Sequence, residues 1–236
     1  LVYSMENAVL TDFHAHILPG ADHGSKNIET SVKQLKLLSA AGVGRVVATP
    51  HFYPNADSIK GFLSRRAEAA KLLCGADTSG FPRVYLGAEV LVCPGIERMD
   101  GLQKLCIDAT NVILLEMPFS HWSEAYYETV YNVSHSGLTV VMAHIDRYPE
   151  EKAIRLIEEC GVYVQLNAEC FAKFRGRRLM SRWLGRGCVA AYGSDIHGAD
   201  KTAACRLGQM FEKTGDAGTA VMQKTDMLLS DAASLI

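Results

Sequence analysis

The sequence predicts a single-domain α/β protein, a distorted (β/α)7 TIM-like barrel built on parallel strands. Three observations predict it: apolar strand-like runs alternate with helical runs, seven such strands can be read, and histidine or acidic residues repeatedly stand just past a strand. Strands in β-then-α order form a parallel sheet whose carboxyl ends meet at one rim. The chain has 236 residues, a size typical of one barrel, so residues 1–236 are expected to be one domain.

The elements follow one another in regular order. The first strand is expected at 8–13, and helix 27–41 follows it, with Ile28, Val32, Leu35 and Leu38 on one helical face and Gly42 at its end. The other strands are expected at 45–49, 83–88, 111–116, 139–143, 162–167 and 189–193. The helices are expected at 58–73, 124–135, 150–160, 179–186, 201–213 and 217–229.

Composition narrows the function. The formal net charge is −2, so no basic excess is present to neutralise the phosphates of a nucleic acid. Apolar runs such as 140–143 are far shorter than the ~20 residues of a membrane-spanning helix. No charged segment followed by an apolar one opens the sequence, so no signal peptide is expected and the location is expected to be cytoplasmic.

The cysteines argue against thiol chemistry. Seven are spread along the chain without a Cys-x-x-Cys pair, which is typical of reduced, mostly buried thiols. A cysteine-based phosphatase would need an arginine six positions after its cysteine, and no cysteine here has one.

The polar residues at the strand ends are metal-ligand types. His14 and His16 follow the first strand, and Asp195 and His197 follow the last. Residues two apart on a strand project to one face, so each pair can reach one metal ion. A lone pair of this kind is more often structural than functional. In a closed barrel, however, the first and last strands are neighbours, so the two pairs are expected to meet.

Two carboxylates and two further histidines stand at the same rim. Glu89 and Glu116 end apolar strands, and buried like charges are costly without a cation between them. Taken singly, each carboxylate is more simply a solvated loop residue, and His51 or His144 a hydrogen-bonded core histidine. Together the eight side chains are too many for one zinc ion and predict a site for two or three divalent metals.

These motifs resemble those of the polymerase-and-histidinol-phosphatase (PHP) superfamily of metal-dependent phosphoesterases. The resemblance is stronger to the bacterial PHP-type protein-tyrosine phosphatases of capsule and exopolysaccharide loci. It covers most of the chain, from Asp12 to about Asp200, and rests on the runs 14–24, 48–52, 142–148 and 193–198.

The resemblance implies a cluster of two or three divalent ions, most often manganese, with iron and zinc as alternatives. His14, His16, Glu89 and Asp195 would bind the first ion. Glu89 would bridge to a second ion near Glu116 and His144, and His51 and His197 would complete the second and third sites. Arg147 matches an arginine that steadies the phosphoryl group, and His144 or His51 is a candidate acid for the leaving group.

One position departs from the subgroup pattern. Where the subgroup has two consecutive aspartates before glycine, this chain has Asp22, His23 and Gly24. His23 is expected to replace the second aspartate as a ligand, which would make the cluster less anionic and alter its metal preference. Two alternatives are that Asp22 takes the ligand role, and that Asp22 serves only the turn before Gly24.

The implied reaction is hydrolysis of phosphotyrosine by metal-bound hydroxide, on a bacterial tyrosine kinase or another protein of polysaccharide synthesis. A basic cluster of Lys173, Arg175, Arg177, Arg178, Arg182 and Arg186 is either a solvated helix face or an attractor for an acidic substrate tail. A homo-oligomer is an open alternative that no residue decides.

Two other functions compete. The first is hydrolysis of a small phosphate monoester such as histidinol phosphate, which the ligands alone do not distinguish; the rim loops around 53–59 and 121–127 are expected to decide. The second is a binding module with a degenerate site, for which the exchange at His23 would be an early step.

Overall fold

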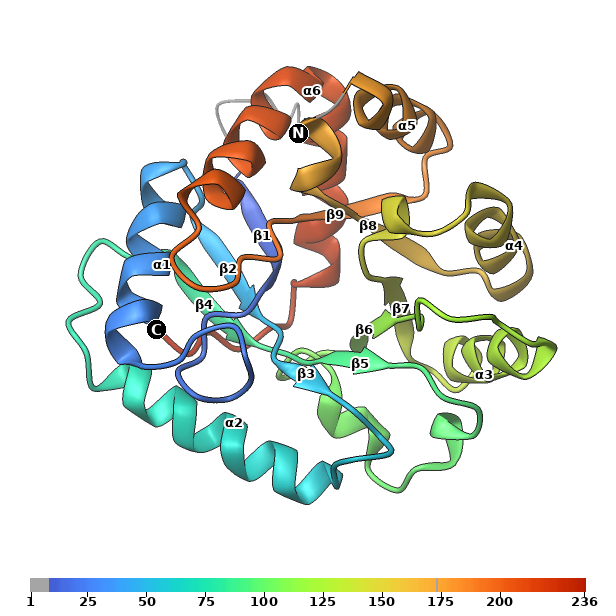
Figure 1. The fold of residues 1–236 in the computed structure, drawn as a ribbon, viewed down its shortest axis with the longest axis horizontal. Helices are drawn as coiled ribbons and strands as arrows, with labels where there is room; N and C mark the ends of the chain where they lie inside the picture. Colours follow the sequence, from blue (N-terminus) through green and yellow to red (C-terminus); the bar gives the residue numbers. More distant parts are fainter. Residues whose placement is uncertain (1–8, 173) are drawn as a thin grey trace.

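The strands lie at the centre of the molecule and the helices surround them (Figure 1). The computed structural model describes residues 9–172 and 174–236. All the named strands pair in parallel, in two sheets of order β1-β2-β4 and β3-β5-β6-β7-β8-β9. The strands are β1 (Thr11–Ala15), β2 (Arg45–Ala48), β3 (His51–Phe52), β4 (Arg83–Leu86), β5 (Glu89–Leu91), β6 (Val112–Glu116), β7 (Thr139–Met142), β8 (Tyr163–Asn167) and β9 (Val189–Gly193).

Each of the seven strands expected from the sequence is present, and two of them have short continuations that were not expected. After β2, Thr49 and Pro50 interrupt the ladder before β3, and after β4, Gly87 and Ala88 precede β5. Pro50 has no N–H to give to a ladder, which explains the break. The carbonyl of Pro50 still accepts from the backbone N–H of Glu89 at 3.1 Å, which holds β3 and β5 side by side.

The first and last strands are neighbours, as expected. Ala15 forms a parallel bridge with Ile196, and the backbone N–H of Asp195 donates to the carbonyl of His14 at 2.8 Å. Asp12, fully buried on β1, reinforces this junction by accepting from the backbone N–H of Ser194 at 2.8 Å and from its hydroxyl. Burial raises the pKa of the Asp12 carboxyl to about 6, and the hydrogen bonds from Ser194 offset part of that rise.

β1 extends further than the sequence predicts. The expected strand, 8–13, begins outside the described residues, and the observed strand continues through His14 to Ala15. A histidine reads as the end of an apolar run, but His14 is fully buried and continues the ladder. Because His14 is polar, the end of the strand could not be recognised from the run of apolar residues.

The helices cover the outside of the strands (Figure 1). They are α1 (Ile28–Ala40), α2 (Ile59–Cys74), α3 (Glu124–Ser134), α4 (Glu150–Cys160), α5 (Phe174–Gly185) and α6 (Lys201–Leu228). Short 3-10 turns lie at Ile96–Arg98, Leu102–Leu105, Ile145–Arg147 and Ala168–Ala172. Within residues 9–172 and 174–236, no helix is both long and apolar enough to cross a membrane.

One helix boundary differs from the expectation. α5 begins at Phe174, five residues before the expected 179, because the run from Arg175 to Arg178 shows no apolar face in the sequence. The two final helices expected at 201–213 and 217–229 are confirmed: α6 is divided by a kink at Gly215, whose backbone is not helical and whose φ is 53°. A positive φ costs glycine little, so the chain changes direction there between the two helical halves.

Candidate metal centre

The predicted site residues come together at the carboxyl ends of the strands. His14 lies on β1, His51 begins β3, Glu89 begins β5 and Glu116 ends β6. The remaining four follow strand ends: His16 after β1, His144 after β7, and Asp195 and His197 after β9. Six segments far apart in the sequence therefore supply one cluster.

Glu89 is the centre of this cluster. Its Oε2 lies 2.9 Å from His51 Nδ1, 3.1 Å from His14 Nε2 and 3.3 Å from His16 Nε2, and its Oε1 lies 3.0 Å from His144 Nε2. Burial raises the pKa of the Glu89 carboxyl, but the surrounding histidines outweigh it and hold that pKa well below the usual range. The carboxylate is thus ionised and needs positive charge around it.

The ligand atoms form four overlapping groups in which all members lie within 4.8 Å of one another. The groups are His14, His16 and Asp195; His14, Glu89 and His144; His51, Glu89 and Glu116; and His16, His51 and His197. Glu89 belongs to two groups, which is the arrangement of a carboxylate that bridges two ions. The expected meeting of the first and last motifs is confirmed, since His16 Nε2 lies 3.2 Å from Asp195 Oδ1.

Unpartnered lone pairs show that the cluster fits metal ions. His51 Nδ1, Glu89 Oε2 and His197 Nε2 are buried and make no hydrogen bond. His51 Nδ1 and Glu89 Oε2 approach to 2.9 Å without the alignment of a hydrogen bond. Buried polar atoms are nearly always partnered, so converging unpartnered acceptors of nitrogen and oxygen type match divalent metal ligands.

Gln165 positions two of the histidines, a role that the sequence analysis missed. Its Oε1 lies 3.3 Å from His14 Nδ1 and accepts from the backbone N–H of His144 at 2.7 Å. A proton on Nδ1 of His14 leaves its Nε2 lone pair directed at the cluster. Gly193 leaves room for this contact, because a Cβ there would lie 2.6 Å from Gln165 Nε2. A polar residue between Val164 and Leu166 in an expected strand was the available signal.

Asp22 positions His16 and His51. Its Oδ2 lies 2.7 Å from His16 Nδ1 and accepts from the backbone N–H of His51 at 3.0 Å, while Oδ1 accepts from Gly24 N–H at 2.8 Å. Burial raises the pKa of the Asp22 carboxyl, but His16 and the two backbone donors outweigh it and lower that pKa overall. Asp22 therefore accepts a hydrogen bond in the turn before Gly24, as one alternative predicted. Its carboxylate also contacts the ring nitrogen of His16 that points away from the cluster.

The backbone is strained at two site residues. His144 has a φ of 30° and Asp195 a φ of 53°, in the left-handed region that side chains rarely adopt. The expectation that Asp195 and His197 share a face through strand alternation is wrong, because β9 ends at Gly193. The left-handed turn at Asp195, held by its hydrogen bond to the His14 carbonyl, directs the carboxylate into the cluster instead.

Arg147 lies beside the cluster. Its Nη2 is 2.6 Å from Asp195 Oδ2 and 3.9 Å from a carboxylate oxygen of Glu169. Burial lowers the pKa of Arg147, and the carboxylate of Asp195 more than reverses that effect. The half-buried guanidinium is held in place with donors left over for a bound anion.

His23 lies at the edge of the cluster. Its ring centroid is 4.8 Å from those of His51 and His197, with interplanar angles of 9° and 30°. It is exposed and belongs to none of the four ligand groups. The structure thus brings His23 to the site without placing its nitrogens among the converging atoms.

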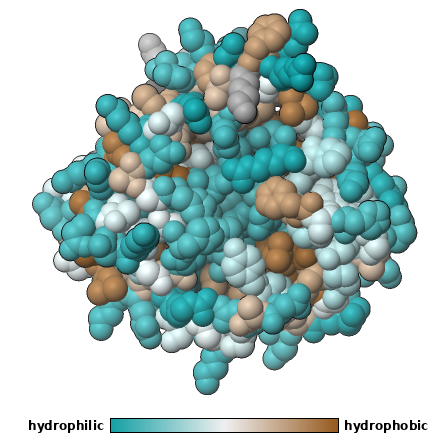
Figure 2. Space-filling model, viewed as in Figure 1, coloured by the Kyte–Doolittle hydropathy of each residue, from teal (hydrophilic) through white to brown (hydrophobic). Residues whose placement is uncertain are grey.

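A cavity of about 460 Å³ opens over the cluster. Besides the site residues, its wall contains Tyr53, Leu91, Pro118 and Phe119. The side chain of Phe119 is 71% exposed. The expected rim segment 121–127 does not line it, because Trp122 is buried against Tyr127 and Tyr148. The face drawn in Figure 2 is hydrophilic in its hollowed centre, with apolar side chains on the rim.

The basic cluster is mostly engaged in local contacts. Arg182 pairs with Glu150 at 2.7 Å, and Arg177, Arg178 and Arg186 each lie over an aromatic ring. Lys173 lies outside the described residues. Only Arg175 lines a cavity next to Arg147, so a solvated, self-paired helix face accounts for most of this cluster.

The chain is similar to known proteins over most of its length. A family model described as "Capsular polysaccharide synthesis, CpsB/CapC" matches residues 10–232. The tyrosine-protein phosphatase YwqE of Bacillus subtilis is 26% identical over 201 residues, which are 80% of this chain and 77% of that protein. The tyrosine-protein phosphatase CpsB of Streptococcus agalactiae is 24% identical over 215 residues, covering 81% and 84%.

Solved structures share the fold. A chain from the crystal structures of YwqE from Bacillus subtilis and CpsB from Streptococcus pneumoniae, described as metal-dependent tyrosine phosphatases, matches with a TM-score of 0.75 at 20% identity, covering 94% of this chain and 95% of that one. A β-aspartyl dipeptidase from Fervidobacterium islandicum matches with a TM-score of 0.52 at 10% identity, over 94% of this chain and 75% of that one.

Proposed function

The chain belongs to the CpsB/CapC family of capsular polysaccharide synthesis, and on that premise we propose that it is a metal-dependent phosphatase of phosphotyrosine in proteins. The observation that supports this most is Glu89, a buried carboxylate shared by two groups of ligand atoms. Its curated relatives are named tyrosine-protein phosphatases, which agrees with a phosphoester as substrate.

We propose the following ligand roles. His14, His16 and Asp195 would hold one ion, Glu89 with Glu116 and His144 would hold a second, and His16, His51 and His197 would hold a third. Divalent ions in such a site polarise a phosphoryl oxygen and lower the pKa of water. Carboxylate and imidazole together suit manganese, with iron and zinc as alternatives.

Arg147 orients the phosphoryl group in this proposal. Its guanidinium stands at the wall of the cavity, fixed by Asp195 at 2.6 Å, and presents its remaining N–H groups to the phosphoryl oxygens. Donors that are fixed beforehand stabilise the charge that spreads over those oxygens in the transition state. The guanidinium is effective because it is held in place, and its ion pair with Asp195 holds it there.

The leaving tyrosyl oxygen needs a proton or a positive charge. The nitrogens of His51 and His144 that face the cluster belong to ligand groups, and a nitrogen that binds metal has no proton to give. We therefore propose ligand roles for both, and assign the stabilisation of the phenolic oxygen to the ions and Arg147 rather than to a histidine acid. Because a phenol leaves readily, no strong acid is required.

The mouth of the site supports a protein substrate. A cavity of about 460 Å³ with the exposed Phe119 and the partly exposed Tyr53 on its wall offers aromatic surface for a tyrosyl ring. We propose a phosphorylated bacterial tyrosine kinase of polysaccharide synthesis as the partner and the cytoplasm as the location. A small ester such as histidinol phosphate has no tyrosyl ring to pack against the aromatic side chains on the rim of this cavity.

The proposal is tested by phosphate release after removal and return of metal. The protein is stripped with a chelator, refilled with manganese, and assayed on a phosphotyrosine peptide and on histidinol phosphate. Turnover of the peptide that returns with manganese supports the proposal. Turnover of only the small ester moves the function to that substrate class, and bound metal without turnover of either identifies a degenerate binding module.

A further inference from the structure

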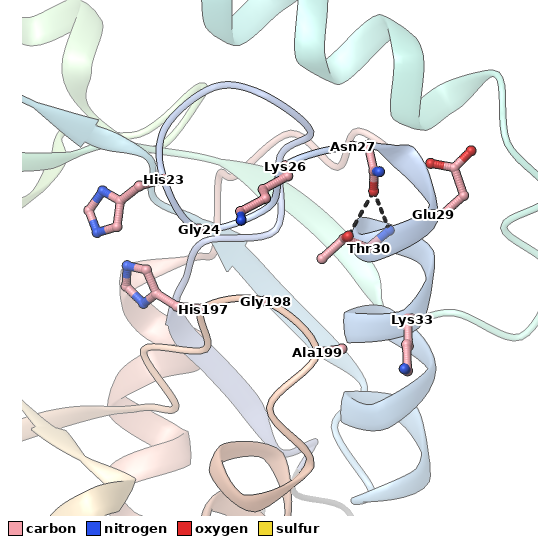
Figure 3. A pocket seen from close by; sticks show the side chains of 10 residues that line it. All are labelled: His23, Gly24, Lys26, Asn27, Glu29, Thr30, Lys33, His197, Gly198 and Ala199. Atoms are coloured by element: carbon pink, nitrogen blue, oxygen red, sulfur yellow. Dashed lines mark hydrogen bonds between the residues drawn. The ribbon is translucent and has the colours of Figure 1, made fainter.

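A second cavity adjoins the metal centre and shares His23 and His197 with it. It has a volume of about 540 Å³ and lies between the loop at 23–27, the first turns of α1 and the loop at 197–199. His23 and His197 line both this cavity and the mouth of the metal centre, so the two spaces meet at these imidazoles (Figure 3). We name it the lysine cavity, after Lys26 and Lys33 on its wall.

The lysine cavity carries a positive charge. Lys26 and Lys33 are both exposed, and Glu29 is the only carboxylate on its wall. In Figure 3 the amino group of Lys26 extends toward the side on which His23 and His197 lie. Among the ion pairs of residues 9–172 and 174–236, neither lysine takes part, although many of the molecule's arginines do. Two ammonium groups are therefore available to an incoming anion.

The other cavity beside the metal centre is less suited to an anion. It is lined by Arg147 and Arg175, but also by Asp146 and Glu169, and its volume is about 230 Å³. Arg147 already lies near Glu169 and Asp195. The lysine cavity is larger and has the greater excess of cations.

We infer that the lysine cavity selects phosphotyrosine substrates with an anionic side chain next to the phosphotyrosine, either a carboxylate or a second phosphate. This inference rests on the proposed function. The tyrosyl ring lies against Tyr53 and Phe119 and the phosphoryl group lies over the cluster. The neighbouring anion reaches past His23 and His197 to Lys26, and Lys33, further along α1 (Figure 3), adds to the positive charge of the cavity. Both lysines are specificity determinants and take no part in the chemistry.

The test compares kcat/KM for three peptides that differ only beside the phosphotyrosine, with alanine, aspartate or a second phosphotyrosine there. The wild-type protein is expected to favour the anionic peptides by about five-fold or more, the size of one or two exposed ion pairs. The Lys26→Glu/Lys33→Glu variant is expected to remove or invert this preference. Lys36→Glu, which reverses the charge of one exposed lysine on α1 outside the cavity, is the control and is expected to retain the preference.

Each outcome of this experiment either supports or overturns the inference. A preference in the wild type that is lost in the double variant, kept in the control and weakened by salt supports the inference. No preference in the wild type, or an equal preference in the double variant, overturns it while leaving the phosphatase proposal intact. Wild-type turnover of p-nitrophenyl phosphate, which has no neighbouring residue, tests the phosphatase proposal separately; its absence overturns both. The aspartate and second-phosphate peptides identify the source of the anion.

Discussion

Asp22 and His16 form a hydrogen-bonded pair, 2.7 Å between Oδ2 and Nδ1, that fixes the opposite ring nitrogen of His16 toward the carboxylates of Glu89 and Asp195. A carboxylate behind a ligand histidine sets both its tautomer and its orientation. The same carboxylate accepts from the backbone N–H of His51, so one side chain positions two of the proposed ligands.

Replacing Asp22 is expected to weaken metal binding. Asp22→Ala removes the acceptor from His16 Nδ1 and from His51 N–H, and we expect a loss of roughly 10- to 100-fold in metal affinity. Competition with a fluorescent chelator measures it. Asp57→Ala, which removes a carboxylate paired with the surface residue Arg65, is the control. Unchanged affinity in Asp22→Ala would show that the turn alone is the role of Asp22.

Gln165 is expected to affect metal retention nearly as much as Asp22, although it is not among the proposed ligands. Gln165→Ala removes the oxygen shared by His14 Nδ1 and the backbone N–H of His144, which leaves the strained turn at His144 without support. We expect metal to be released by chelator at least about ten-fold faster. Gln103→Ala, which removes an exposed side chain from the 3-10 turn Leu102–Leu105, is expected to release metal at the wild-type rate. Equal rates in both variants would contradict the positioning role.

The exchange at His23 is expected to shift metal preference. His23→Asp adds a carboxylate beside the all-imidazole group of His16, His51 and His197. Harder oxygen ligands favour manganese over zinc, so we expect the ratio of bound manganese to zinc to rise. Elemental analysis after dialysis against equal concentrations of the two metals measures it. An unchanged ratio would place His23 outside the metal's surroundings.

Arg147 is expected to contribute to the rate more than a lysine could. Arg147→Lys keeps the charge but loses the fork that pairs with Asp195 and reaches the phosphoryl group. We expect kcat/KM on a phosphotyrosine peptide to fall by roughly 10²-fold or more, the cost of one transition-state donor. Metal content measured in parallel should stay at the wild-type level. A variant with wild-type kinetics would remove Arg147 from the phosphate site.

The cysteine thiols are expected to take no part in catalysis. Burial raises the pKa of Cys106 and of Cys160 to about 11 and that of Cys170 to about 12, so these thiols stay protonated near pH 8. Cys74 and Cys205 are exposed. Ellman's reagent is expected to modify these two rapidly and the buried three only on unfolding. Alkylation of the exposed pair should leave phosphatase turnover unchanged, and inactivation would revive a thiol mechanism.

The residues that converge in the cluster were easier to predict from the sequence than the side chains that position them. His14, Glu89, Glu116 and His144 each end an apolar run, and that contrast is visible in the sequence. Gln165 and Asp22 act through contacts with residues 151 and 6 positions away, and no local pattern identifies such partners. The order of the strands was predictable because apolar runs alternate with helical runs. The division into two sheets was not, because β2 pairs with β4 before Pro50 while β3 pairs with β5 after it, and this pairing involves residues far away in the sequence.

The adjacency of β1 and β9 has a consequence for biosynthesis. His14 and His16 leave the ribosome well before Asp195 and His197, which lie beside them in the folded cluster. The amino-terminal side of a domain emerges first during synthesis, so these two histidines wait for their partners from β9. The groups of His14, Glu89 and His144 and of His51, Glu89 and Glu116 do not depend on those partners, whereas the groups that contain Asp195 or His197 do. A chain that stops before residue 195 therefore lacks two of the four groups, and docking of the β9 segment on β1 is the step that completes the cluster.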